Sequence, residues 1–360
     1  MTDTKPKGCC LVTGGAGFIG CSISEQLATH YEQVIAIDNL HPQVHVSGKR
    51  PDALHQAVLL VVGDVTSADM WDDVLTKYAP STVIHLAAET GTGQSLTEGS
   101  RHAMVNVVGT ARMLDALAER KILPSRMVLS SSRAVYGEGA WQDQNGALTY
   151  PGQRSAPMLE RGEWDFPGLQ SNPFSAQATQ ARPTSIYGAT KLAQENILSS
   201  WAQAFDVSLN ILRLQNVYGP GQSLTNPYTG IVSLFARLAK AGRSIPLYED
   251  GLMRRDFVFI TDVASAIVAA ATSNRRNILV DIGSGRSLSI AGLAHIIADI
   301  YGAPEPHVTG QYRNGDVRHA ACNIEASQAT LDWIPRITAE EGIRKLCNWI
   351  DERPETLPQL

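Results

Sequence analysis

A tyrosine and a lysine four residues apart, Tyr187 and Lys191, begin a predicted helix that continues to about Phe205. On a helix this spacing puts both side chains on one face, one turn apart, so that the ammonium lies beside the phenol. A neighbouring positive charge favours the phenolate and allows proton transfer at neutral pH. The pair therefore predicts a tyrosine base, although most pairs with this spacing are ordinary surface residues.

Three consecutive serines at 130–132 follow a short apolar strand predicted over 127–129. Parallel α/β sheets bind ligands at the carboxyl ends of their strands, and a hydroxyl there can bridge a substrate oxygen and the tyrosine. A serine cluster alone is equally compatible with a turn. Together with the helix pair, it predicts a catalytic set of three residues: Ser132, Tyr187 and Lys191.

The spacing of three glycines indicates a nucleotide-binding turn. A buried strand predicted over 8–13 runs directly into Gly14, Gly17 and Gly20, and a helical stretch follows them. The tight turn, the close approach of the backbone to a pyrophosphate and the packing of helix on strand each need a missing side chain. We predict dinucleotide contacts from Gly14, Gly17, Phe18, Ile19 and Gly20.

The next strand indicates which dinucleotide binds. It is predicted over 33–37 and ends in Asp38 and Asn39, which we take as further cofactor contacts. A carboxylate at this place accepts hydrogen bonds from both ribose hydroxyls and would repel a 2′-phosphate. NAD is therefore favoured over NADP, unless a nearby arginine changes the preference.

Later strand ends supply more predicted cofactor contacts. Asp64 and Val65 follow a strand over 58–62, and Asp64 either caps a turn or meets the adenine amine. Small residues after the strand at 82–86 let the backbone pass close to the cofactor. The further predicted contacts are Leu86, Ala87, Ala88, Asn106, Ser130, Tyr187 and Lys191.

Two polar residues near these contacts leave alternatives open. His85 is predicted to be packed in its strand rather than to act as a base. Asn106, in a helical stretch over 99–120, is either an inward-facing ligand group or a tolerated polar residue of the helix. The alternation of short apolar strands with helices predicts an α/β fold, a Rossmann-type doubly wound parallel sheet.

Composition excludes several classes of protein. The 360 residues are 44% hydrophobic and 18% charged, which is typical of a soluble globular protein. A net charge of -5 without a basic run argues against nucleic acid, and no apolar run is long enough to span a membrane, so we expect a cytoplasmic protein. Five cysteines without a C-x-x-C pair predict reduced thiols and no metal site.

Taken in order, the motifs resemble those of extended short-chain dehydrogenase/reductases of the nucleotide-sugar epimerase and dehydratase group. They are TGGAGFIG at 13–20, HLAA at 85–88, NVVGT at 106–110, SSSRAVYG at 130–137, YGATK at 187–191, RLQNVYGPG at 213–221, RRDFVFITDV at 254–263 and GDVRH at 315–319. The resemblance covers nearly the whole chain. It implies that Ser132 hydrogen-bonds a sugar, that Tyr187 accepts and returns a proton, and that Lys191 holds the nicotinamide ribose and lowers the pKa of the tyrosine.

The resemblance also implies two domains. An NAD-binding Rossmann domain would comprise 1–216 and 254–283, and a smaller α/β domain for the nucleotide sugar would comprise 217–253 and 284–353. The implied substrate contacts are Thr90, Ser132, Arg133, Tyr187, Asn216, Arg255 and Arg318. Asn216 could instead form the turn before Gly219.

Arginines are the candidates for gripping the diphosphate, because a guanidinium pairs bidentately with phosphate oxygens. Arg255 and Arg318 match family positions, and Arg313 is an additional candidate. Arg254 is expected to face solvent. Asp316 is interpreted as a cap or as a partner of an arginine.

The residues at 132–134 indicate the reaction. The 4,6-dehydratases of this group carry Thr-Asp-Glu where this chain has Ser132, Arg133 and Ala134. Removing water needs an acid/base pair that arginine and alanine cannot supply. The resemblance therefore implies a 4-epimerase that oxidises C4, lets the keto sugar rotate and returns the hydride. The alternatives are a nucleotide-sugar 4-reductase and, least expected given the intact catalytic set, a non-catalytic NAD-binding scaffold.

The stretch between Tyr136 and Tyr187 is longer than is usual in the family, and it shows no helical or strand period. It is either a lid or a decoration on the solvent side. A similar insertion, often with paired cysteines, and the ETGTGQS sequence seen here at 89–95 occur in dTDP-L-rhamnose 4-epimerases. This chain has no cysteine in the insertion.

The implied substrate is a dTDP- or UDP-linked hexose. The pair dTDP-L-rhamnose and dTDP-6-deoxy-L-talose is preferred, with UDP-glucose and UDP-glucuronate as alternatives, and lipopolysaccharide O-antigen biosynthesis is the matching role. The resemblance also implies a homodimer that packs through the helices near 99–120 and 187–205.

Overall fold

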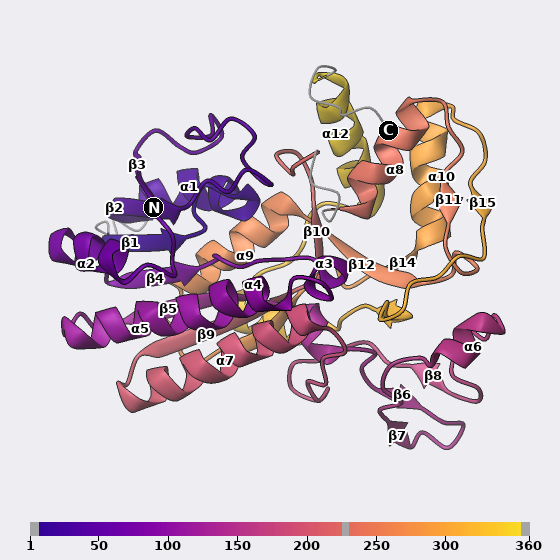
Figure 1. Ribbon diagram of the computed structural model, residues 1–360, viewed down its shortest axis with the longest axis horizontal. Coiled ribbons are helices and arrows are strands. Elements are labelled where there is room, and N and C mark those ends of the chain that lie inside the picture. Colours follow the sequence, from indigo (N-terminus) through magenta and orange to yellow (C-terminus); the bar gives the residue numbers. More distant parts are fainter. Residues whose placement is uncertain (1–6, 225–229, 354–360) are drawn as a thin grey trace.

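The computed structural model describes residues 7–224 and 230–353, and its centre is a seven-stranded parallel sheet (Figure 1). Its spatial order is β13-β9-β5-β4-β1-β2-β3. In chain order the strands are β1 Lys7–Thr13, β2 Tyr31–Asp38, β3 Val58–Val62, β4 Thr82–His85, β5 Arg126–Ser132, β9 Ser208–Leu214 and β13 Leu279–Ile282. The predicted doubly wound α/β fold is confirmed.

Helices cover both faces of this sheet. Helices α1 (Phe18–His30) and α9 (Ile260–Thr272) share a buried core on one face, and α2 (Ala68–Lys77), α5 (Gly109–Glu119) and α7 (Ile186–Ala204) cover the other (Figure 1). Strands buried on both faces read as continuous apolar runs. Strand β9 departs from this rule, because all seven of its residues are buried and three of them, Ser208, Asn210 and Arg213, are polar.

The register of the central strands builds the site. Ser132, the last residue of β5, pairs with Leu214, the last residue of β9. The carboxyl end of β5 therefore lies beside the turn that leads into β10 (Asn216–Tyr218). Short helices α3 (Thr92–Ser95) and α4 (Gly99–Ala103) and a π-helical turn η1 (Met104–Val108) connect β4 to α5.

A smaller unit lies beyond the carboxyl ends of the strands (Figure 1). Its core is formed by α8 (Ile231–Lys240), α10 (Ile290–Tyr301) and α12 (Ala339–Asp351). Its strands are β10, β12 (Arg254–Phe259), β14 (Ser287–Ser289) and β16 (His319–Ala320) in one sheet, and β11 (Pro246–Leu247) and β15 (His307–Val308) in another. Helix α11 (Glu325–Leu331) packs on α9 and β13.

One expected domain limit differs from the observed pairing. The sequence predicts that the chain re-enters the Rossmann domain at residue 254. In the structure, the strand that starts there, β12, pairs with β10, β14 and β16 of the small sheet. The first element back on the large sheet is α9. The domain limits otherwise stay a prediction.

The insertion has a defined structure. It contains β6 (Trp141–Gln142), β7 (Leu148–Thr149), α6 (Ala156–Glu160) and β8 (Gln170–Ser171), and the three strands form an antiparallel sheet. A 3₁₀ turn, η2 (Arg133–Tyr136), precedes it. Strands of two residues are too short to produce a visible period, so the sequence could not reveal them. Within 7–224 and 230–353 no helix is both long and apolar enough to cross a bilayer.

Candidate active site

Close packing between α7 and η2 brings the predicted base to the serines. The hydroxyl of Ser185 caps α7 by accepting from the Gly188 N–H at 3.0 Å. A side chain on Gly188 would overlap the carbonyl oxygen of Ala134. Glycine at 188 therefore lets the first turn of α7 approach η2, and Tyr187 reaches a hydrogen bond with Ser132.

Opposing influences act on the Tyr187 phenol. Burial raises its pKa, whereas the hydrogen bond with Ser132 and the charge of Arg133 lower it. We expected the lowering charge to come from Lys191. In the structure Arg133 supplies it.

Lys191 is 2% exposed, and burial lowers its pKa to about 7 while the Glu195 charge raises it. Its ammonium makes no hydrogen bond to any other residue that the structure describes. A buried ammonium with unused donors suits a ribose hydroxyl, which is the predicted role. Glu195 lies one turn further along α7, is paired with Arg213 at 2.7 and 2.9 Å, and accepts from Ser131.

Sequence reasoning missed Glu195. Glu195 follows Lys191 by four residues, so it lies on the same helix face as Tyr187 and Lys191, and this spacing could have identified it from the sequence. The carboxylate is 4% exposed, so it sets the electrostatic surroundings of Lys191 from inside the protein.

The glycine turn has the geometry expected for a dinucleotide. Helix α1 begins after Gly17 without a side-chain cap, which leaves the first-turn N–H groups for a phosphate. Gly14 has a φ of 66°, and a side chain there would meet the Ala87 backbone nitrogen at 2.8 Å. A side chain on Gly20 would overlap the Gly15 carbonyl oxygen. Phe18 and Ile19 are partly buried against the hydrophobic cores.

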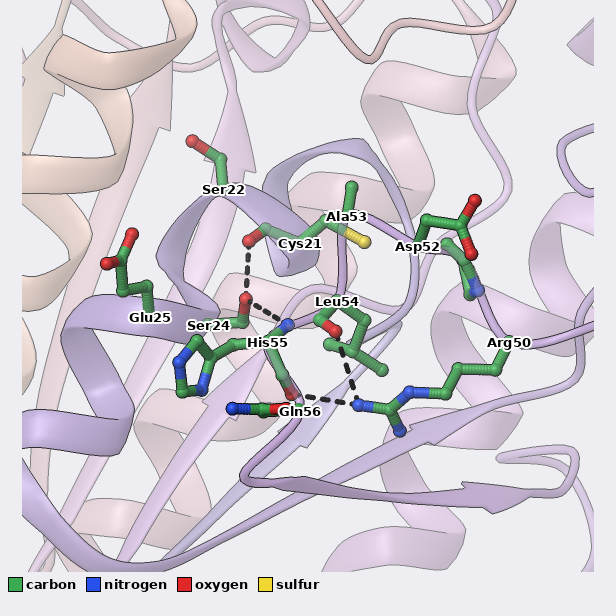
Figure 2. Close-up of a pocket in the computed structure, with 11 residues that line it drawn as sticks. Cys21, Ser22, Ser24, Glu25, Arg50, Asp52, Ala53, Leu54, His55 and Gln56 are labelled. Carbon is green, nitrogen blue, oxygen red and sulfur yellow. Dashed lines mark hydrogen bonds between the residues drawn. The ribbon is translucent and has the colours of Figure 1, made fainter.

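Asp38 faces this turn. Its carboxylate accepts from the backbone N–H groups of Ala16 at 3.1 Å and Leu40 at 2.9 Å, and His45 lies 3.5 Å away. The arginine that could have changed the NAD preference is Arg50, the first arginine after Asp38. It donates to the carbonyls of its own loop in a surface hollow of about 670 Å³ beside α1, and no predicted site residue lines that hollow (Figure 2).

The Asp64 alternatives are partly resolved. Its carboxylate accepts from the Thr66 N–H at 2.8 Å and hydroxyl at 2.7 Å, so it caps the turn. Asn39 donates to the other oxygen at 3.2 Å. Val65 is buried. Contact of Asp64 with adenine stays a prediction.

The loop after β4 is held by buried polar residues. Asn106 faces inward, accepts from the Glu89 N–H at 2.8 Å, and donates to the Glu89 carbonyl at 3.0 Å and the Thr190 hydroxyl at 2.9 Å. Its polar atoms thus position the loop that contains Ala87 and Ala88, and its contact with NAD stays a prediction. His85 is packed, as predicted: burial lowers its pKa to about 3.

Three of the predicted substrate contacts come together. The Arg133 Nε donates to the Asn216 Oδ1 at 2.6 Å, and burial and the charge of Arg255 lower the pKa of Arg133 to about 9. Arg255 is 7% exposed and donates only to the carbonyls of Arg254, Val317 and Arg318 among oxygens. In the described part of the chain no carboxylate lies within salt-bridge distance of either guanidinium. Asp316 and Glu138 act on both guanidinium groups only through their charge, so two cations without a carboxylate in contact with them would suit an anion.

Arg318 has a different environment. Its guanidinium contacts Asp165, Glu249 and Asp250 at 2.7 to 3.1 Å. A diphosphate would have to displace one of these carboxylates, and the predicted substrate contact of Arg318 stays a prediction. Arg313 is exposed, lies over the Tyr248 ring at 5.0 Å, and has no carboxylate partner among the residues described.

Buried residues dock the insertion on the small unit, and the stretches 144–148 and 160–163 within it are exposed to solvent. Arg154, which is 3% exposed, forms two bonds of 2.8 Å with Glu249 and donates to the Asp316 carbonyl at 2.8 Å. Trp141 is buried and its ring lies 5.6 Å from that of His319. Charged residues make up no larger share of 137–186 than of the whole chain, so composition did not signal this docking.

Comparisons with known proteins agree with this geometry. Residues 10–157 and 166–283 match the profile of the NAD dependent epimerase/dehydratase family. A dTDP-L-rhamnose 4-epimerase of Burkholderia thailandensis is 58% identical over 341 residues, which are 94% of each chain. Two solved structures also match, each at 27% identity: the UDP-glucose 4-epimerase of Thermotoga maritima with UDP-glucose (TM-score 0.79, covering 96% of this chain and 100% of that one) and that of Thermus thermophilus with NAD (TM-score 0.75, 95% and 99%).

Proposed function

The chain belongs to the NAD dependent epimerase/dehydratase family, and from that premise we propose that it inverts C4 of dTDP-L-rhamnose to give dTDP-6-deoxy-L-talose. The observation that carries the choice of reaction is the site around Tyr187. It holds one proton-transfer group, and position 133 is an arginine bonded to Asn216. The acid/base pair needed for dehydration is therefore missing from positions 133 and 134.

The residues present fit an NAD molecule. The pyrophosphate would fit at the uncapped start of α1 and at Gly14, where a side chain would fill the space. One ribose would contact Asp38, and the other would bind the ammonium of Lys191, which has no hydrogen-bond partner among the described residues. When bound, NAD supplies the hydride acceptor and donor.

The protein groups supply proton transfer and orientation. Tyr187 accepts the proton of the 4-hydroxyl as C4 is oxidised, and Ser132 hydrogen-bonds the same oxygen. Arg133, Arg255 and Arg313 hold the diphosphate by charge, so the keto sugar can rotate without leaving. Tyr187 then returns the proton when the hydride comes back to the opposite face.

A homodimer belongs to the same proposal. Three large apolar side chains on the α3, α4 and α7 side are exposed by 57%, 51% and 38%: Leu96, Met104 and Ile186. A two-fold partner packed on this side would cover them. A cytoplasmic location and a role in lipopolysaccharide O-antigen biosynthesis follow from the proposed substrate alone.

Proton NMR of purified protein with dTDP-L-rhamnose tests the reaction and the substrate. We expect the C4 epimer to appear without net formation of NADH, and Tyr187→Phe to lower the rate by about 1,000-fold because the general base is lost. If the protein instead inverts UDP-glucose or UDP-glucuronate, the proposed mechanism stands and the proposed substrate is wrong. Stoichiometric consumption of NADH or NADPH would make the protein a reductase.

A further inference from the structure

His102 is a fully buried residue near the end of α4, and sequence reasoning assigned it no role. Its ring lies against that of Tyr187, with centroids 6.4 Å apart and planes at 73°. It is therefore one of the groups in direct contact with the proposed base.

Both ring nitrogens of His102 face carbonyl oxygens. Nδ1 lies 3.0 Å from the Glu98 carbonyl oxygen, and Nε2 lies 3.3 Å from that of Thr90. A carbonyl oxygen only accepts hydrogen bonds, whereas a neutral imidazole has one donor and one acceptor nitrogen. Both contacts are favourable only if each nitrogen carries a proton, that is, if the ring is an imidazolium.

Charged groups flank the ring on the side of the loop after β4. On its own element His102 has Glu98 and Arg101, and the loop after β4 adds Glu89. Arg101 pairs with both carboxylates, at 2.9 and 2.8 Å, so the three groups together carry one negative charge.

The other neighbours lie on the side of the reaction. Helix α7 presents Tyr187 and, one turn further on, Lys191, and η2 presents Arg133, whose charge acts on the phenol. His102 contacts the Thr90 carbonyl on one side and the Tyr187 ring on the other. One turn later, Asn106 donates to the Glu89 carbonyl and to the Thr190 hydroxyl. These two connections join the loop after β4 to the first turns of α7.

We propose that His102 is a positioning residue for Tyr187, held as an imidazolium that orients the phenol and favours its ionised form. Only the role of Tyr187 as base rests on the proposed function. The protonation state of His102 can be measured without any substrate, so the two ideas can fail separately.

Nitrogen NMR of the NAD-loaded protein labelled in its histidines tests the protonation state, and His102→Gln identifies the signal. We expect the two ring nitrogens of His102 to have similar chemical shifts at neutral pH, as in an imidazolium. Widely separated shifts, as in a neutral ring, would overturn the proposal.

Ultraviolet titration of Tyr187 in the NAD-loaded protein tests the effect on the base. Loss of one cation at this distance should raise the pH at which the Tyr187 phenolate appears by about one unit. We expect this in His102→Gln and in His102→Phe, which keeps a ring against Tyr187. His295→Gln, at an exposed histidine of α10, is the control and should leave the titration unchanged.

The pH dependence of epimerisation is the kinetic counterpart. In both His102 variants the rising limb of kcat against pH should move to higher pH by the same amount, because Tyr187 must be ionised to accept a proton. A uniform loss of kcat without any displacement, together with an unchanged phenolate titration, would make His102 a packing residue and refute the proposal.

Discussion

Arg133 and Arg255 lie next to Arg154 and Arg318, yet the two pairs of arginines are neutralised differently. The first pair donates to an amide and to carbonyl oxygens, and the second contacts carboxylates of Glu138, Asp165, Glu249 and Asp250. The pairs even touch, since Arg255 donates to the Arg318 carbonyl at 3.1 Å. A buried arginine with carboxylate partners joins parts of the protein, whereas one without them is ready for an anionic ligand.

Breaking the neutralised pair should have the largest effect on stability. Arg154→Met leaves the Glu249 carboxylate buried without its bidentate partner, so we expect a loss of about 4 kcal/mol in the free energy of unfolding. Urea denaturation measures it. Arg161→Met removes an exposed pair with Glu163 and should cost far less stability. If the two variants lose equally little, the insertion is not held by these charges.

Removing a poorly neutralised arginine should act on binding instead. Arg255→Met deletes charge-assisted hydrogen bonds to the proposed diphosphate, so KM should rise about 100-fold. The free energy of unfolding should change by less than about 1 kcal/mol, because the lost carbonyl bonds are offset by removal of an unpaired buried charge.

Arg254→Met is the matched control for this experiment. Arg254 is the preceding residue and is exposed, so its loss should leave KM unchanged. An Arg255→Met protein that unfolds easily but binds substrate normally would show that both arginine pairs are structural, and the distinction between them would fail.

The smallest expected effect is on pH dependence. Burial raises the pKa of Glu138 from 4.5 to about 7, against the lowering effects of the Arg318 N–H and the Arg154 charge. Because folding raises this pKa, its contribution to stability is complete below pH 4.5 and is lost as the pH rises through about 7.

Glu138→Gln should therefore be more stable than the wild type above pH 7, by an amount of order 1 kcal/mol, and no more stable near pH 4.5. Chemical denaturation across this range measures the difference. Glu163→Gln is the control: the pair with Arg161 lowers the pKa of Glu163 below its usual value, so this variant should differ from the wild type by a constant amount across this range. A constant difference between Glu138→Gln and the wild type would mean that Glu138 does not titrate in this window.

Local spacing explains what the sequence could predict. The glycine turn and the helix pair Tyr187 and Lys191 each depend on residues within one turn of each other, and the strand ends then collect at one edge of a parallel sheet. The sheet and its helices were therefore predictable, and so was the convergence of Ser132 with Tyr187.

Long-range pairing explains what it could not. Arg318 matches a family position for phosphate, but Asp165, which lies 153 residues earlier in the chain, occupies its Nε. No local pattern reveals such a partner. The exchange of Lys191 for Arg133 as the charge that acts on Tyr187 was hidden for the same reason, because it depends on how η2 packs against α7.

The docked insertion also bears on how substrate range can change. Ser132, Tyr187 and Lys191 take their hydrogen bonds and charge partners from the large sheet and its helices, and none of those partners lies within 137–181. Replacing the insertion would therefore leave the partners of these three residues in place. A replacement insertion would need matching partners at Glu249, Asp250 and Arg318, because these residues form the ion-pair network that includes Arg154 and Asp165.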